Sequence, residues 1–209
     1  MGETEDSDAW YNKGVALGSL GRYKEAIVCF DEVIKLDPED SGAWSDKGNS
    51  LSSLGRYEEA IACFDEAIKL YPVKTSAWNN KGKSLSSLRC HKEAIVCFDE
   101  VIKLDPVNSL AWDDKGNSLS SLEKYEEAIA CYDEAIKLDP EDSFAWGNKG
   151  HSLGSLGRNK EAIACFDEVI KLDPEDSLAW GNKGVALKKF DRDEEAEQCF
   201  AKARELVDS

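Results

Sequence analysis

The sequence has few basic side chains for its acidic ones, because 26 Lys and Arg stand against 42 Asp and Glu, for a net charge of −16. Nucleic acids and anionic membrane surfaces attract proteins whose Lys and Arg neutralise their negative charge. A chain with this excess of carboxylates is repelled by both, so we expect neither nucleic acid nor membrane as a partner.

Long apolar runs are also missing, and none approaches the ~18 residues that a membrane-spanning helix requires. The start, Met1 to Asp6, has neither the basic nor the apolar region of a signal peptide, and Asp6 stands where a myristoylation signal requires Ser or Thr. These absences predict a cytoplasmic protein.

The residues of common catalytic and metal sites are scarce. Only two histidines are present, His91 and His151, and neither lies near a nucleophile in a strand–turn–helix context. There is no Gly-rich phosphate loop and no C-x2-C pair, and the one local group of Cys90, His91 and Cys97 offers three ligands without a fourth. We therefore expect no catalytic residue, no metal site and no cofactor, and a protein that is not an enzyme.

Against these absences, tryptophan recurs at a fixed step of 34 residues, at Trp10, Trp44, Trp78, Trp112, Trp146 and Trp180. Glycine follows each Trp by four residues, and five units close with a proline. A fixed period of this length indicates a repeat array. The period predicts an N-terminal tail of residues 1–6 and six units at residues 7–40, 41–74, 75–108, 109–142, 143–176 and 177–209.

Two amphipathic helices can be predicted within each unit. In the first unit, Trp10, Gly14 and Leu17 share one face of a helix, and Ala26 and Phe30 share one face of the next. We expect the small residues to allow close crossing of the two backbones, with the aromatic residues filling the space on either side.

The pattern W-x3-G-x2-L, followed by A-x3-F-x2-A/V and a closing proline, resembles the tetratricopeptide repeat family over Ser7 to Ser209. The resemblance implies an all-α fold, a right-handed α-solenoid or superhelix of six antiparallel helix pairs, whose first helices line a concave peptide-binding groove. The sixth unit has Asp208 in place of the proline, and Glu197 and Arg204 replace apolar residues, which predicts a polar C-terminal cap.

Candidate groove residues follow each Trp by two positions, at Asn12, Asp46, Asn80, Asp114, Asn148 and Asn182. An Asn side chain can both donate to and accept from a peptide backbone. In superhelices of this family an asparagine ladder binds extended chains, and the resemblance implies the same role here. The two Asp residues favour basic or hydroxyl side chains, and the alternative is that all six are simply solvated.

A second set follows each Gly by one position and includes Asn49, Lys83, Asn117 and His151. These residues differ between repeats, so they would set side-chain preference along the groove, unless the differences are ordinary variation. The small residues further along each first helix, Gly18 and Ser52 among them, predict a groove that is wide and polar.

Three apolar residues, Leu110, Phe144 and Leu178, stand two positions before their tryptophans, where earlier units have Asp8, Gly42 and Ser76. Exposed apolar residues that cluster often mark interaction sites. We expect either an anchor for a partner or for a second copy in a homodimer, or side chains that pack half-buried on the preceding loop.

The second helices repeat an Asp-Glu pair followed by Lys three residues after the Glu, as at Asp31, Glu32 and Lys35. This face is predicted to be solvated, with weak Glu–Lys pairs along each helix. One cysteine falls in each unit at the same position, which suggests small, partly buried side chains in a reducing compartment.

These observations predict a protein–protein interaction scaffold that binds an extended polar or basic peptide segment of a partner. Two alternatives stay open. One is a self-associating structural assembly unit that pairs through the Leu110, Phe144 and Leu178 strip, and the other is a substrate-recruiting fragment of a larger enzyme.

Overall fold

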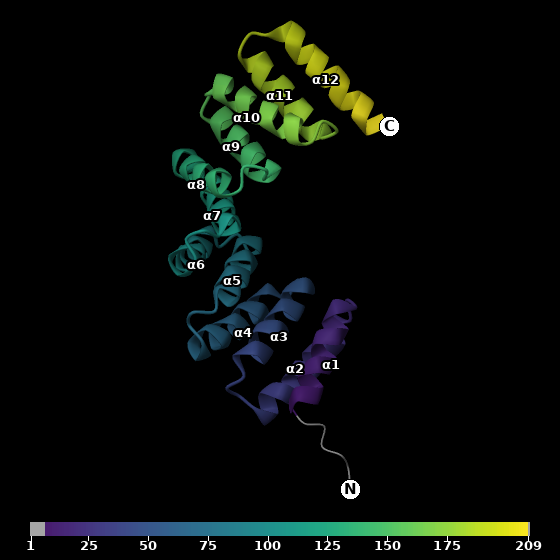
Figure 1. Cartoon of the computed structure of the whole chain (residues 1–209), viewed down its shortest axis with the longest axis vertical. Coiled ribbons are helices and arrows are strands. Elements are labelled where there is room, and N and C mark those ends of the chain that lie inside the picture. Colours follow the sequence, from purple (N-terminus) through teal and green to yellow (C-terminus); the bar gives the residue numbers. More distant parts are fainter. Residues whose placement is uncertain (1–6, 209) are drawn as a thin grey trace. The chain divides into compact units, whose positions relative to one another are not determined.

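The computed structural model describes residues 7–208, which are helical with short connections and contain no strand. They fall into two compact units, divided between Pro106 and Val107 (Figure 1). Unit 1 contains α1 (Ser7–Ser19), α2 (Tyr23–Leu36), α3 (Ser41–Ser53), α4 (Tyr57–Leu70), α5 (Thr75–Ser87) and α6 (His91–Leu104). The predicted tail of residues 1–6 lies outside the described part of the chain.

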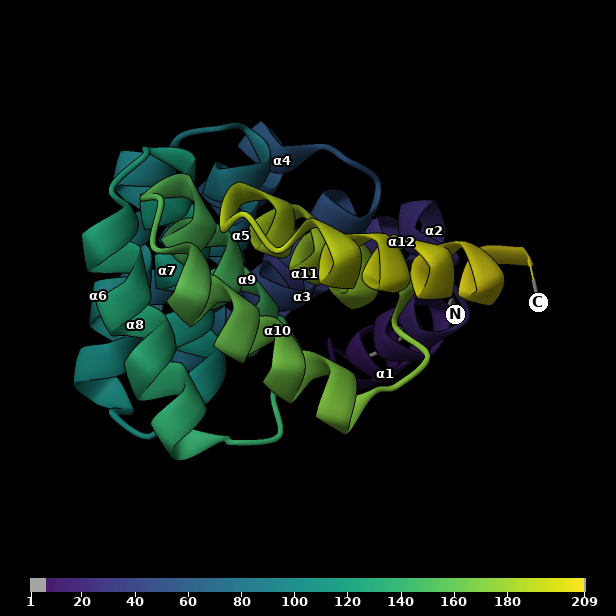
Figure 2. The ribbon, with the colours of Figure 1, turned by 90° about the horizontal axis from the view of Figure 1, so that it is seen from above.

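Unit 2 contains α7 (Ser109–Ser121), α8 (Tyr125–Leu138), α9 (Ser143–Ser155), α10 (Asn159–Leu172), α11 (Ser177–Lys189) and α12 (Asp193–Asp208). Within each unit every helix packs on the next, and the first helices of consecutive pairs also touch, as α9 touches α11. Figure 2 shows the hairpin of α11 and α12 with its two helices alongside each other. The predicted all-α solenoid of helix pairs is confirmed.

Local chemistry explains where the helices begin and turn. Asp40 caps α3, since its Oδ1 accepts from the backbone N–H of Ala43 at 2.9 Å, and Asp142 and Asp176 cap α9 and α11 in the same way. The turn after α1 places Gly21 at a φ of 74°, a left-handed conformation that ends the helix.

The core of each pair contains an aromatic ring that lies over a glycine, and this ring is Phe in five pairs and Tyr132 in the fourth. Phe64 has no exposed surface, and a Cβ added at Gly48 would lie 2.6 Å from its Cε1 atom. The glycine therefore makes room for a ring, whereas the sequence suggested that it makes room for a crossing backbone. The tryptophan is only half-buried, and Trp44 donates its indole N–H to the Pro38 carbonyl at 3.0 Å.

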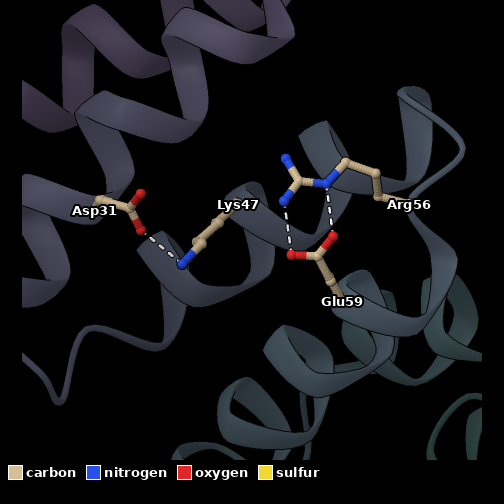
Figure 3. Close-up of polar contacts among 4 residues, drawn as sticks. All are labelled: Asp31, Lys47, Arg56 and Glu59. Atoms are coloured by element: carbon tan, nitrogen blue, oxygen red, sulfur yellow. Dashed lines mark hydrogen bonds and ion pairs between the residues drawn. The ribbon is translucent and has the colours of Figure 1, made fainter.

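Within each unit, ion pairs join a second helix to the next first helix. In unit 1, Lys47 Nζ lies 2.6 Å from Asp31 Oδ1 (Figure 3). The same atom lies 5.5 Å from the centre of the Trp44 ring. The same link recurs between Asp65 and Lys81, Asp133 and Lys149, and Asp167 and Lys183. These aspartates are exposed, as predicted, and they also connect successive pairs, which the sequence did not indicate.

The glutamates of the same motif behave as predicted. Glu32 pairs with Lys35 along α2 at 3.3 Å, and the pair is mostly exposed. Figure 3 also shows Arg56, at the start of α4, binding both carboxylate oxygens of Glu59. These exposed pairs add little to stability, because water screens them.

Candidate functional site

The polar side chains predicted to line a groove all lie on the first helices of the pairs. Six are half-buried, namely Asp46, Asn49, Asn80, Asp114, Asn117 and Asn148. Four are exposed, namely Asn12, Lys83, His151 and Asn182. Five of the half-buried residues, Asp46, Asn49, Asn80, Asn117 and Asn148, hydrogen-bond to polar side chains of their own or a neighbouring helix.

In unit 1 a row of hydrogen bonds crosses three first helices. The Tyr11 hydroxyl of α1 donates to Asp46 Oδ2 on α3 at 2.7 Å, and Asn49 Nδ2 donates to the other oxygen, Oδ1, at 3.2 Å. Asn80 on α5 then donates from Nδ2 to Asn49 Oδ1 at 2.7 Å. Burial and the bond to Asp46 raise the pKa of Tyr11, so its hydroxyl keeps the proton that it donates. We call these four residues the unit 1 row.

Unit 2 carries a similar arrangement with different members. The Tyr132 hydroxyl donates to Asn117 Oδ1 at 2.9 Å, and Asn117 Nδ2 donates to Asp113 Oδ2 at 2.9 Å. Asn148 on α9 donates from Nδ2 to Asp113 Oδ1 at 3.3 Å. These four residues form the unit 2 row. Neither row includes Asn12, which lies exposed on α1.

Sequence reasoning missed three members of these rows. Tyr11 and Asp113 directly follow their tryptophans, one residue before the position predicted to line the groove. Tyr132 stands where the other pairs have phenylalanine. The change from Phe to Tyr was a usable signal, because a buried Tyr hydroxyl normally finds a hydrogen-bond partner.

Asp113 is the one carboxyl of the unit 2 row, and its pKa is raised. Its burial raises its pKa to about 6, a rise that Asp142 and Asp114 support and that the donors Asn148 and Asn117 oppose. An unfolded Asp has a pKa of about 3.9. The folded state therefore holds the proton more tightly, and this group's contribution to stability is lost as pH rises through about 6.

The substitution Asp113→Asn is expected to remove this loss of stability with rising pH. The unfolding free energy of the variant relative to wild type should rise by about 1 kcal/mol between about pH 4.5 and 7.5, less than full linkage because the side chain is only half-buried. Urea unfolding at both pH values measures it. Glu126→Gln, at an exposed carboxylate on α8, is the control. If the difference in unfolding free energy between Asp113→Asn and wild type does not change with pH, the raised pKa of Asp113 is contradicted.

Each unit also has a cavity between two of its first helices, and Asp46 and Asn49 of the unit 1 row line the cavity in unit 1. In unit 1 a cavity of about 210 Å³ is lined by Gly14, Val15, Gly18, Ser19, Tyr23, Phe30, Asp46, Asn49, Ser50 and Ser53. In unit 2 a cavity of about 160 Å³ is lined by Gly150, His151, Gly154, Ser155, Asn159, Phe166, Asn182, Val185, Ala186 and Lys189. Both are too small for a whole ligand and suit a single side chain.

The apolar strip is exposed. Leu110, Phe144 and Leu178 show 61, 79 and 77 % of their surface to solvent. The alternative in which these side chains pack half-buried on the preceding loop is therefore wrong. Their role as an anchor stays a prediction.

Metal ligands, cysteine thiols and membrane spans are the other features of the described residues that bear on function. Residues 7–208 contain no cluster of three His, Cys, Asp or Glu side chains placed to hold a metal. Burial raises the pKa of the Cys97 and Cys165 thiols to about 11, so both are protonated at neutral pH. Over the same residues, every helix is too short or too polar to cross a membrane.

Comparison with known proteins agrees with the helix pairs. A family model described as tetratricopeptide repeat matches residues 7–40, 41–72, 75–108, 111–142 and 143–176, and a second model of that description matches residues 165–198. No curated protein matches the chain. Proteins built from such repeats are typically scaffolds without enzymatic activity.

Solved structures show the same fold. YrrB, described as a TPR protein with an unusual peptide-binding site, is 26 % identical over 85 % of this chain and 91 % of its own, with a TM-score of 0.72. MamA from Desulfovibrio magneticus RS-1 is 23 % identical over 84 % of this chain and 99 % of its own, with a TM-score of 0.78. Since the repeat model matches most of its length, the chain belongs to the tetratricopeptide repeat family, whose fold supports a role as a protein-interaction scaffold.

Proposed function

We propose that the chain binds an extended, polar or basic peptide segment of a partner along the first helices of its pairs. The observation that carries the proposal is the pair of hydrogen-bonded rows, which lie on α1, α3 and α5 in unit 1 and largely on α7 and α9 in unit 2. The described peptide-binding site of YrrB supports the same class of ligand.

The rows suit a peptide backbone for two physical reasons. An Asn side chain has two N–H donors and a carbonyl that accepts two bonds, so one bond to a neighbouring helix leaves capacity for a ligand. That bond also holds the amide in one orientation, which lowers the entropy cost of binding. Asn80 and Asn148 both combine a fixed orientation with partial exposure.

Peptide arrays test the proposal. Wild type is expected to retain a set of polar or basic peptides, and the Asn80→Ala and Asn148→Ala variants are expected to bind that set about 5- to 10-fold more weakly, which corresponds to one or two lost hydrogen bonds. Lys69→Ala, at an exposed ion pair on α4, is the control and should bind like wild type. If both Asn variants keep their fold and bind every peptide unchanged, the proposal is wrong.

A second candidate function is self-association through the strip that includes Phe144 and Leu178, and their high exposure favours it. Light scattering across a dilution series, which measures the molecular mass in solution, distinguishes self-association from peptide binding. A mass that stays at 23.1 kDa at every concentration contradicts self-association and leaves peptide binding in place.

The six segments predicted from the period are proposed as the repeats of the array, with the last as its polar cap, because Glu197 is exposed where Ile163 of the fifth pair is buried. A cytoplasmic setting is proposed because the seven cysteines are free and six of them are buried, as in a reducing compartment.

A further inference from the structure

The cavities of the two units occupy the same place in their helix pairs. Gly14, Gly18 and Phe30 in unit 1 correspond to Gly150, Gly154 and Phe166 in unit 2, each 136 residues later, which is four repeats of 34 residues. Each cavity lies between two consecutive first helices and is floored by a buried ring. The chain therefore contains two copies of one pocket.

Glycine keeps these two pockets open. In the second and fourth pairs a serine takes the glycine's place and reaches the next first helix. Ser52 Oγ lies 3.3 Å from Ser84 Oγ, and Ser120 Oγ lies 3.4 Å from Ser152 Oγ. A Cβ added at Gly18 or Gly154 would meet no atom within 4 Å. The space left by the absent side chain at Gly18 and at Gly154 thus forms the pocket in each unit.

The lining of the two pockets differs in charge. Unit 1 has Asp46 and Ser53 where unit 2 has Asn182 and Lys189. Unit 1 also has Val15 and Tyr23 where unit 2 has His151 and Asn159. Asp46 is therefore the one charged side chain that lines the unit 1 pocket, and the rest of that lining is apolar or small and polar.

We propose that the unit 1 pocket receives a Lys or Arg side chain of the bound peptide. This inference rests on the proposed function, because it assigns a side-chain preference to the same surface. The apolar stem of the ligand residue lies along Val15 and Tyr23, and its cationic end reaches the Asp46 carboxylate. The unit 2 pocket, with Lys189 in its wall, repels the same side chain.

The surroundings of Asp46 fit this role. Tyr11 and Asn49 each donate one hydrogen bond to a different carboxylate oxygen, so the group is oriented. A carboxylate oxygen can accept a second bond, and a cation that enters the pocket supplies a charge-assisted donor. Orientation before binding and partial burial both strengthen such a pair relative to one in water.

A double-mutant cycle tests the inference. Peptides selected by wild type from a random library are expected to be enriched in Lys or Arg at one position. Replacing that residue by norleucine should weaken binding to wild type about tenfold and binding to Asp46→Asn by less than about twofold, because the cation then has no carboxylate to meet. Asn keeps an oxygen that accepts from Tyr11, and thermal unfolding confirms that the variant is folded.

A second variant reduces the volume of the unit 1 pocket. Gly18→Ser is expected to weaken the Lys peptide about tenfold, because its Oγ reaches toward Ser50 as Ser52 reaches toward Ser84. Glu39→Gln, which removes an exposed loop carboxylate of unit 1, should leave binding unchanged and excludes a general charge effect. The pocket assignment alone is overturned if the selected peptides show no preference for Lys or Arg. It is also overturned if norleucine weakens binding to Asp46→Asn as much as binding to wild type. A library from which wild type selects nothing overturns the proposed function as well.

Discussion

Replacing Phe64 by alanine is expected to lower the free energy of unfolding by about 3–5 kcal/mol, as large-to-small changes in well-packed cores do. The ring has no exposed surface and belongs to a cluster with Ile27, Leu51, Ala60 and Cys63. It therefore supports both its own helix pair and the pair before it. Urea unfolding followed by circular dichroism measures the loss.

The equivalent ring at the far end of the array is the matched control. Phe200 of α12 is only half-buried against its core cluster, so Phe200→Ala should cost less and loosen α12 before the rest of unit 2. Hydrogen exchange of the α12 amides reports that local loosening. Equal losses for the two variants would show that the contribution of a ring does not depend on its place in the array.

The helix pairs could be predicted because each repeat buries the same residues for the same reason. A period of 34 residues places every Trp, Gly and Phe on equivalent faces, and Asp40 before Ser41 marks a helix start by its capping chemistry. Local signals of this kind act within one helix or one turn. They do not depend on how two helices are oriented.

Contacts between helices of different pairs could not be predicted in the same way. The link from Asp31 to Lys47 depends on how α2 and α3 cross, and the spacing of 16 residues shows nothing of that crossing. The hydrogen bond from Tyr11 to Asp46 joins residues 35 positions apart, and it likewise depends on how two helices are arranged. Periodicity also cannot separate a fully buried ring such as Phe64 from the half-buried Trp44, whose indole N–H binds a loop carbonyl.

The glycines of the first helices have two different functions, and substitution by alanine separates them. Gly48→Ala is expected to destabilise the chain by about 1–3 kcal/mol, because the new Cβ would lie 2.6 Å from Phe64 Cε1 and the buried ring cannot move away freely. Any gain in helix propensity is smaller than this cost.

Gly18→Ala is expected to have the opposite sign. No atom lies within 4 Å of the new Cβ, and Gly18 is inside α1, so alanine should stabilise the helix by about 0.5–1 kcal/mol. Urea unfolding of the two variants in parallel measures both effects. Since the chemical change is the same at both positions, opposite signs can only come from the neighbouring ring. Destabilisation by both variants would mean that Gly18 also fills a packing role, and the pocket beside it would then owe its space to something other than the missing side chain.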